Sequence, residues 1–188
     1  MINSFIAFLN SIHPLSDEAS KALQSIISVQ RFPKNSILLS EGQVLDRLYF
    51  LCEGLARAFY FDNHQEFTSW ILPENEFIIS PYSFSLQKPS FETIQLLEDS
   101  VVITIERKDL ESLYKSFPEI TYVSLKITEG YLLLYDERTR SLRLSAEERF
   151  IRFQNQYPRL LMRLQVQHIA SFLGLSRSRI SFLRNKVK

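Results

Sequence analysis

The spacing of hydrophobic positions changes twice along the chain. Residues 3–12 and 16–30 show helical spacing, and Ser16 followed by Asp17 and Glu18 is typical of a helix N-terminus. The spacing then favours short strands, which we expect at Ser36–Ser40, Arg47–Cys52, Leu55–Phe61, Glu66–Leu72, Glu92–Leu97 and Val101–Glu106. From Lys108 onward the pattern is helical throughout. Together these patterns predict an α+β protein whose N-terminal antiparallel β-unit is closed or sandwiched and is flanked by helices.

A long helix is expected after Pro118, extending to about Arg140. Five of its residues recur at spacings of three and four, as in the seam of a coiled coil: Ile120, Val123, Ile127, Gly130 and Leu134. Three other residues are expected to point away from this seam and onto the β-unit: Leu125, Leu132 and Leu133. We interpret the helix as a dimer seam that links two parts of the chain. A helix that is simply buried in the core is the alternative.

The most specific pattern lies in residues 166–185 and is that of a helix-turn-helix. Such a motif requires apolar residues at fixed positions, a small residue where the helices cross, and glycine in the turn. Counted from Val166, all seven required positions are filled, by Ile169, Ala170, Leu173, Gly174, Leu175, Ile180 and Leu183.

The second helix of this pair carries the candidate nucleic-acid-binding side chains. Ser176 is expected as its N-cap, and its outward face is expected to present Arg177, Ser178, Arg179, Ser181, Phe182 and Arg184. Arginine and serine at the start of a recognition helix suit base edges and phosphates in the major groove of double-stranded DNA. Two alternatives stay open: an ordinary antiparallel helix pair, and a helix-turn-helix that contacts only proteins.

Charge is distributed unevenly along the chain. Residues 1–137 carry 10 Lys and Arg against 19 Asp and Glu, whereas residues 138–188 carry 12 against 2. The formal net charge of +1 is therefore the cancellation of an acidic part and a basic part. This asymmetry favours two functional units, with the basic one facing a polyanion. The alternative is a basic face that is only solvated.

The composition also excludes several classes of protein. With 4 Gly in 188 residues there is no GxGxxG or GxxxxGK[ST] phosphate loop. The single Cys52 supports neither an internal disulfide nor an iron–sulfur cluster, and we expect it to be a small core residue. Three scattered histidines, of which the last is His168, offer no metal-ligand spacing, so no metal or cofactor is expected. We interpret them as surface residues, and for His168 a phosphate contact is an equally open alternative. The N-terminal apolar stretch is too short to span a membrane, and we expect a cytoplasmic protein that makes no membrane contact.

Taken with this order of elements, the sequence resembles the Crp/Fnr family of bacterial transcription regulators over almost its whole length. The β-unit carries the pattern in SEGQVLDRLYFLCEGLARAFY, with Gly42, Asp46, Leu48, Tyr49, Leu51 and Gly54, and IASFLGLSRSRISFLR resembles the helix-turn-helix. The resemblance implies a cyclic-nucleotide-binding-like jelly-roll of eight strands (1–117), a dimerisation helix (118–140) and a winged-helix-like reader (141–188). It also implies RNA polymerase as a partner. The wing is expected to be absent or rudimentary, because the sequence given ends soon after the second helix.

One departure from the family concerns the phosphate-binding cassette. Members that bind cyclic nucleotides carry Gly-Glu after the sixth strand and an arginine about ten residues later. Here the corresponding residues are Ile79 and Ser80, then Ser90 followed by Phe91. Without that arginine the ion pair to the phosphate is lost, although Lys88 lies nearby in the sequence. We therefore expect an effector other than cyclic AMP. A hydrophobic or aromatic ligand and a barrel filled by its own side chains are equally open.

A second departure concerns the reader. Arg177 matches the family's arginine at the helix start, which pairs with guanine, but Ser178 replaces a base-reading glutamate and Phe182 replaces an arginine. The operator is therefore expected to differ from that of the catabolite activator protein. Phosphate contacts are expected from Arg184, Lys186, Lys188 and the basic helices over 138–163.

These observations predict a homodimeric, sequence-specific DNA-binding transcription regulator with an unknown small-molecule effector or none. An enzyme is disfavoured because no GxSxG, HExxH or Cys–His arrangement occurs. The alternative is a ligand-sensing or protein-interaction module whose DNA reader is vestigial.

Overall fold

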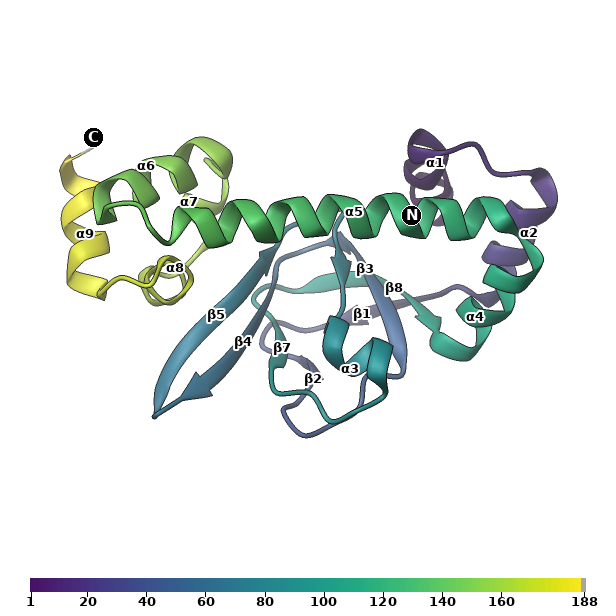
Figure 1. The fold of residues 1–188 in the computed structure, drawn as a ribbon, viewed down its shortest axis with the longest axis horizontal. Helices are drawn as coiled ribbons and strands as arrows, with labels where there is room; N and C mark the ends of the chain where they lie inside the picture. Colours follow the sequence, from purple (N-terminus) through teal and green to yellow (C-terminus); the bar gives the residue numbers. More distant parts are fainter. Residues whose placement is uncertain (187–188) are drawn as a thin grey trace.

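A computed structural model describes residues 1–186. One long helix, α5 (Pro118–Ser141), runs along the molecule, as Figure 1 shows. The β-strands pack under its middle, the helices α1, α2 and α4 gather at one end, and α6 to α9 form a compact group at the other end. Lys188, from which a phosphate contact is expected, lies outside the described residues.

The described β-strands form two four-stranded antiparallel sheets. One has the order β1-β8-β3-β6, formed by Ser28–Phe32, Ser100–Glu106, Arg47–Glu53 and Phe77–Ile78. The other has the order β2-β7-β4-β5, formed by Ile37–Leu39, Thr93–Leu96, Ala56–Asp62 and Gln65–Leu72. Non-consecutive neighbours in both sheets are typical of a jelly-roll, and the predicted antiparallel β-unit is confirmed.

Two strands, β1 and β6, were not predicted from the sequence pattern. The helix expected over 16–30 ends earlier, because α2 spans Asp17–Ile26 and Ser28–Phe32 pairs with β8 as strand β1. Four of the five β1 residues are exposed, so no alternation of buried and exposed positions marks this edge strand. Strand β6 has only two residues, which is too short for a recognisable period.

The helices follow the expected pattern more closely. Ser16 caps α2 by accepting a hydrogen bond from the Ala19 N–H at 3.1 Å. The remaining helices are α1 (Ile2–Ile12), α3 (Pro81–Leu86), α4 (Arg107–Ser116), α6 (Ala146–Gln156), α7 (Leu160–Arg163), α8 (Val166–Leu173) and α9 (Arg177–Lys186). Ser145 and Glu148 form a capping box at the start of α6.

Three hydrophobic clusters hold these elements together. The first joins one sheet to α1, α2, α4 and α5, and the second fills the space between the two sheets. The third belongs to α6–α9 but includes two residues of the β-unit, Leu55 and Ile71. The C-terminal helices and the β-unit therefore share one continuous hydrophobic contact, which buries apolar surface of both.

Glycine is required at two turns. Gly54 has a φ of +108°, and a Cβ atom there would lie 2.1 Å from the Ser100 Oγ. Gly174 ends α8 in the left-handed conformation at a φ of +63°. Among residues 1–186, none of the helices has the combination of length and hydrophobicity that a membrane span requires.

Candidate functional site

The helix pair α8–α9 has the predicted residues at its centre. Ile169, Ile180 and Leu183 are fully buried, and Ala170 and Leu173 are nearly so. The backbone N–H of Leu175 bonds to the Ala170 carbonyl at 2.9 Å, which closes the turn at Gly174. These contacts fix the second helix on the first, so the outward face of α9 is presented on a rigid support.

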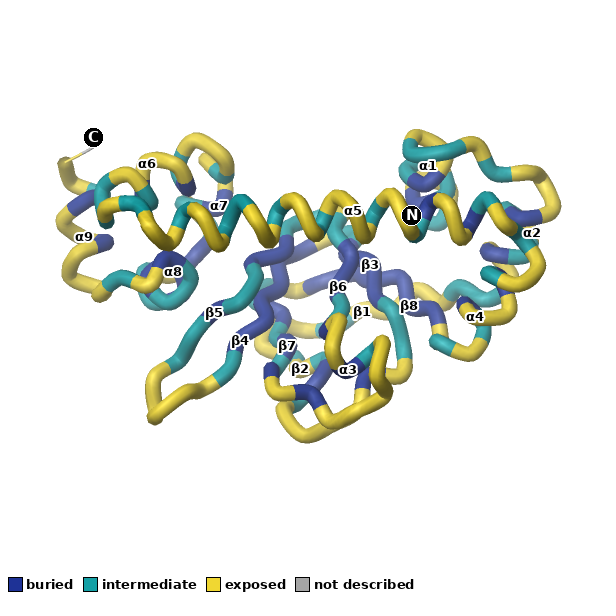
Figure 2. The backbone as a smooth tube through the Cα atoms, in the orientation of Figure 1, coloured by how far each residue is buried: buried dark blue, intermediate teal, exposed yellow. Residues whose placement is uncertain are grey.

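The first half of α9 is exposed, as the C-terminal end of Figure 2 shows. Ser176 caps the helix by accepting a hydrogen bond from the Arg179 N–H at 3.2 Å. Exposed residues then follow on the outward side: Arg177, Ser178, Arg179, Ser181 and Phe182. The Arg179 guanidinium lies 5.3 Å from the centre of the Phe182 ring, so these two side chains support each other at the surface.

Two of the predicted DNA-contacting residues are already engaged within the protein. Arg184 is only partly exposed, and its guanidinium donates to the carbonyls of Leu161 at 2.8 Å and Leu164 at 3.4 Å. The prediction that Arg184 lies on the free outward face is therefore wrong. Lys186 is exposed but pairs with Glu147 at 2.8 Å. Such an exposed ion pair is weak and does not prevent another contact.

Most arginines of α5 to α7 also bond to oxygen atoms within the protein. The basic face expected over 138–163 is therefore mostly not free for phosphate contacts. Burial lowers the pKa of Arg138 to about 10, and its guanidinium donates to the Thr68 carbonyl at 2.8 Å. Arg149 donates to the Leu173 carbonyl at the end of α8 at 2.7 Å. Only Arg143 and Arg159 in this segment are exposed and have no side-chain partner among the described residues.

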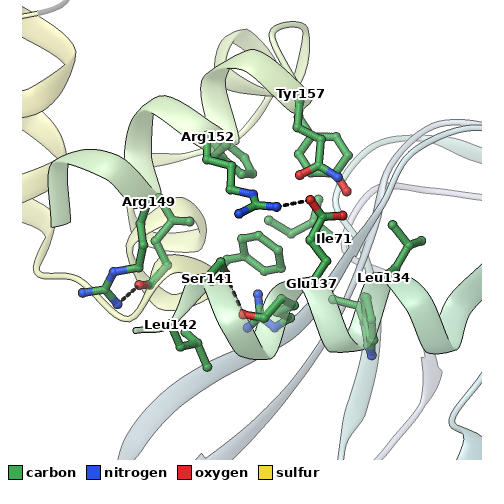
Figure 3. A pocket seen from close by; sticks show the side chains of 14 residues that line it. Ile71, Leu134, Glu137, Ser141, Leu142, Arg149, Arg152 and Tyr157 are labelled. Carbon is green, nitrogen blue, oxygen red and sulfur yellow. Dashed lines mark hydrogen bonds and ion pairs between the residues drawn. The ribbon is translucent and has the colours of Figure 1, made fainter. Parts of the chain in front are cut away.

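The junction between α5 and the C-terminal helices is shown in Figure 3. Arg152 of α6 pairs with Glu137 of α5 beside Tyr157. These groups surround a small cavity of about 60 Å³, which Leu134 also lines. The end of α5 is thus fastened by charge and packing to the helices that follow it.

The β-unit holds the C-terminal helices at two further places. The Ser171 hydroxyl of α8 accepts from the Thr68 N–H at 2.8 Å and donates to the Glu66 carbonyl at 2.9 Å. Arg163 forms ion pairs with Glu74 at 2.7 Å and Glu98 at 2.6 Å. These two carboxylates raise the pKa of Arg163, so the guanidinium stays charged. Neither contact was found by sequence reasoning, because nothing local marks partners that are 65 to 105 residues apart.

His168 lies in this same interface and not at the surface. Its exposed fraction is 7%, and its Nδ1 has no hydrogen-bond partner among the described residues. Burial, and then the nearby Arg57 charge, lower its pKa to about 4. The interpretation of His168 as a surface or phosphate-contacting residue is therefore wrong. Arg57 was not recognised from the sequence either. Because side chains alternate along a strand, Arg57 lies on the other face of β4 from Ala56 and Ala58. On that face it pairs with Glu66 at 2.6 Å.

The predicted cassette residues are brought together, but they bond to the protein itself. Ser80 and Ser90 are buried, and their hydroxyl oxygens lie 3.3 Å apart. The Ser90 backbone bonds to residues 42 and 43 of the preceding loop, with both distances at 2.7 Å. Ile79 is partly buried against the barrel interior, whereas Phe91 is half-exposed and contacts the Tyr82 ring at 5.8 Å.

Glu92 places an acidic group in this region, whereas a phosphate site requires a positive charge. It is 3% exposed, and burial raises the pKa of its carboxyl group. A phosphate here would meet the uncharged Ser90 at the predicted arginine position and a buried carboxyl group two residues later, and Lys88 is exposed. These observations favour the filled-barrel alternative at this position.

The buried and the exposed face of α5 are the reverse of those expected. Ile120 and Val123 are buried against the β-unit and α1, and Ile127 packs beside them. Leu125, Leu132 and Leu133 are 51%, 66% and 70% exposed. The five predicted seam residues therefore do not form a free seam. Gly130 is exposed, and a Cβ there would meet nothing within 4 Å in the chain. The two faces were exchanged because both are apolar, and periodicity does not tell which of them meets the core.

Cys52 and the acidic side chains show no sign of a metal centre. Cys52 is partly buried in β3, and burial raises the pKa of its thiol. Within residues 1–186, no three His, Cys, Asp or Glu side chains are grouped so as to hold a metal ion.

Comparison with known proteins defines the class of fold. Residues 29–117 match the family profile of the cyclic nucleotide-binding domain. A search of curated proteins found no match. Residues 29–117 are therefore similar to a cyclic nucleotide-binding domain.

Solved structures extend the likeness to nearly the whole chain. FixK2 from Bradyrhizobium japonicum has a TM-score of 0.77 at 14% identity, covering 86% of this chain and 84% of its own. The c-di-GMP-responsive global regulator CLP from Xanthomonas campestris has 0.72 at 15%, covering 92% and 91%. A protein from Eubacterium rectale, described as a transcriptional regulator of the crp/fnr family, has 0.74 at 15%, covering 97% and 87%. At these identities the comparison shows a shared fold with transcription regulators.

Proposed function

We propose that this protein is a homodimeric, sequence-specific DNA-binding transcription regulator of the Crp/Fnr type. The observation that carries the proposal is the exposed first half of α9, where Arg177, Ser178 and Arg179 follow one another on a rigidly packed helix pair. Arg177 is assigned to base edges, and Arg179 and Ser178 to base edges or phosphates. The shared fold with transcription regulators, and the absence of enzymes among the structures named above, support this assignment.

The dimer is proposed to form through the outward face of α5. Leu125 and Leu132 are separated by seven residues and lie on one stripe, which Leu133 and Tyr122 flank. An exposed apolar stripe of this kind marks an interaction surface. Pairing two copies along it would place two α9 helices about 34 Å apart, one turn of DNA, and would predict a near-palindromic operator.

The effector is proposed not to be cyclic AMP. The buried Ser80–Ser90 pair and the buried Glu92 carboxyl group support this, because an uncharged serine stands at the predicted arginine position and a carboxyl group lies two residues later. Calorimetry should detect no micromolar binding of cyclic AMP to the full chain. Micromolar or tighter binding would contradict this part of the proposal. RNA polymerase as a partner and the cytoplasmic location stay predictions.

Selection of bound sequences from a random pool of DNA tests the DNA-binding function. The wild-type chain should enrich one near-palindromic sequence. Arg177→Ala should cost about 1–3 kcal/mol of affinity for that sequence and relax its specificity. The matched control is Arg31→Ala, which removes an exposed arginine from β1 and should leave the affinity unchanged. Failure to enrich any sequence would contradict the proposal.

A second candidate is a protein-interaction module with a vestigial reader. It is favoured by the docking of α8 on β5 and by the internal use of several arginines of the basic segment. The two candidates differ in the salt dependence of DNA binding. A steep fall in affinity with rising salt supports the regulator, and no measurable binding to genomic fragments supports the module.

A further inference from the structure

A cavity of about 140 Å³ lies between the β-unit and the first half of α5. Phe77 and Ile105 of the strands form one side, and Ile120, Val123 and Ile127 of α5 form the other. Most of these side chains are buried, with exposed fractions of 7% or less for Phe77, Ile105, Ile120 and Val123. The cavity is therefore a hollow between α5 and the strands that is partly open to solvent, and the exposed Thr128 is one of the residues that line it.

The residues that line this cavity are uncharged, and its hydroxyl groups lie at the helix side. None of the described residues that line it is Asp, Glu, Lys, Arg or His. Hydroxyl groups are present at the helix side, where Tyr114 and Ser124 form a hydrogen bond at 2.8 Å and Thr128 lies one turn further along α5. An ionised ligand would lose its hydration there without gaining a counter-charge, so the cavity selects uncharged molecules.

The volume sets the size of the ligand. An apolar protein cavity of about 150 Å³ stays dry and accepts benzene, because water finds no hydrogen-bond partners on its walls. The present cavity has a similar volume, but it carries hydroxyl groups on its helix side and is partly open to solvent. It fits a molecule with one aromatic ring and one small polar group.

We propose that this cavity binds a small uncharged aromatic molecule bearing a hydroxyl group. The ring packs between Phe77 and Val123, and the hydroxyl group bonds to Ser124 in place of the Tyr114 hydroxyl. This site lies beside α5, outside the cassette at Ser80 and Ser90, although Ile79 lines both regions.

The position of the cavity connects its ligand to the reader. Val123 and Ile127 belong to α5, and one turn beyond them the Tyr131 hydroxyl accepts from the Phe77 N–H at 2.9 Å and donates to Glu76. A ligand against these residues alters how α5 sits on β6. Since α5 continues to the junction at Glu137 and Arg152, its shift reaches the C-terminal helices. This regulatory step rests on the proposed DNA-binding function; the binding step does not.

Three one-ring probes test the binding step on the full chain: phenol, benzene and benzoate. Calorimetry and protein NMR should show phenol and benzene binding, with shifts of the Val123 and Ile127 methyl signals, and no binding of benzoate. Val123→Phe, which fills the cavity, should weaken phenol binding at least tenfold. The matched control is Val29→Phe, which enlarges an exposed valine of β1 outside the cavity and should leave phenol binding unchanged.

Ser124→Ala provides a test that does not depend on tolerance of the larger side chain. It should weaken phenol binding about threefold or more and leave benzene binding unchanged, since one hydrogen bond contributes about 1 kcal/mol. No binding of phenol and benzene to the wild type would overturn the proposal. So would equal binding of benzoate, or equal phenol binding in the wild type and both cavity variants.

The regulatory step is measured separately, on the DNA sequence obtained by selection. Saturating phenol should change the affinity of the wild type for that sequence at least threefold, and Val123→Phe should abolish this change. Absence of DNA binding both with and without phenol would refute the proposed function and leave the binding site standing. DNA binding that phenol does not alter would refute the regulatory step alone.

Discussion

Two sets of arginines in the C-terminal basic segment show opposite behaviour. Arg138, Arg149 and Arg163 point into the molecule and bond to carbonyl or carboxylate oxygens. Arg177 and Arg179 are exposed on α9. Each arginine of either set adds one positive charge to the count along the sequence, but of these two sets only the second is free to meet a polyanion. Availability of the guanidinium, and not the local net charge, is what locates the candidate DNA-binding surface.

The internal set has its own role. A guanidinium that is held by protein oxygens joins elements that are distant in sequence, since its five N–H donors reach several acceptors at once. Arg163 joins α7 to both Glu74 and Glu98 of the β-unit. We therefore expect the internal arginines to affect stability and the exposed arginines to affect DNA affinity.

The largest expected effect is on DNA affinity when the exposed pair is removed. Arg177→Ala combined with Arg179→Ala should weaken binding of the selected sequence at least about 100-fold, because each lost contact costs about 1–3 kcal/mol. The free energy of unfolding should stay within about 0.5 kcal/mol of the wild type, since both side chains are exposed. Fluorescence anisotropy and urea unfolding measure the two quantities. A large loss of stability in this variant would show that the exposed arginines support the fold, as the internal arginines do.

The next largest effect is on stability when an internal arginine is removed. Arg163→Ala should lower the free energy of unfolding by about 2 kcal/mol, because Glu74 and Glu98 then face each other without a cation. Arg159→Ala removes an exposed arginine four residues away and serves as the control, with an expected change within about 0.5 kcal/mol. Equal losses in the two variants would show that Arg163 does not differ from a surface residue.

The two faces of α5 offer a parallel contrast between an internal and an exposed apolar surface. Leu132→Glu places a charge in the proposed dimer interface and should raise the dimer dissociation constant at least tenfold, as sedimentation would show. The control is Met162→Glu, because Met162 is 90% exposed on α7. If the Leu132→Glu chain stays dimeric at micromolar concentration, the outward face of α5 is not the interface.

A smaller effect concerns the pH dependence of the interface at His168. Its pKa in the folded chain is about 4, below the ordinary value of 6.5, so the unfolded chain takes up the proton first as the pH falls. Its contribution to stability is present above pH 6.5 and is lost on acidification. Between pH 7 and about pH 5.5 we expect about 1 kcal/mol to be lost.

His168→Gln should remove this component of the pH dependence. The buried carboxyl groups of Glu76 and Glu92 have raised pKa values and act in the opposite direction, so the wild type and the variant must be compared at each pH. Urea unfolding at several pH values gives the difference. Parallel curves for the two chains would contradict a neutral, buried His168.

A part of the structure could be predicted from the sequence when the residues that determine it lie close together in the chain. The α8–turn–α9 pair is specified within eighteen residues by apolar spacing, a small residue and a glycine, and those residues occupy the expected places. The length of α5 was also readable from its continuous period. Strand β1 was not, because backbone pairing with β8 alone makes it a strand. The faces of α5 and the internal arginines depend on contacts between distant segments, which periodicity does not encode.

The salt dependence of binding to the selected sequence tests the central claim most directly. For the wild type, log K should fall steeply and linearly with log salt concentration. Arg177→Ala combined with Arg179→Ala should flatten this slope by about one unit for each phosphate contact removed. Arg163→Ala should leave the slope unchanged. A flat slope for the wild type, or a larger flattening by Arg163→Ala than by the α9 variant, would contradict the account.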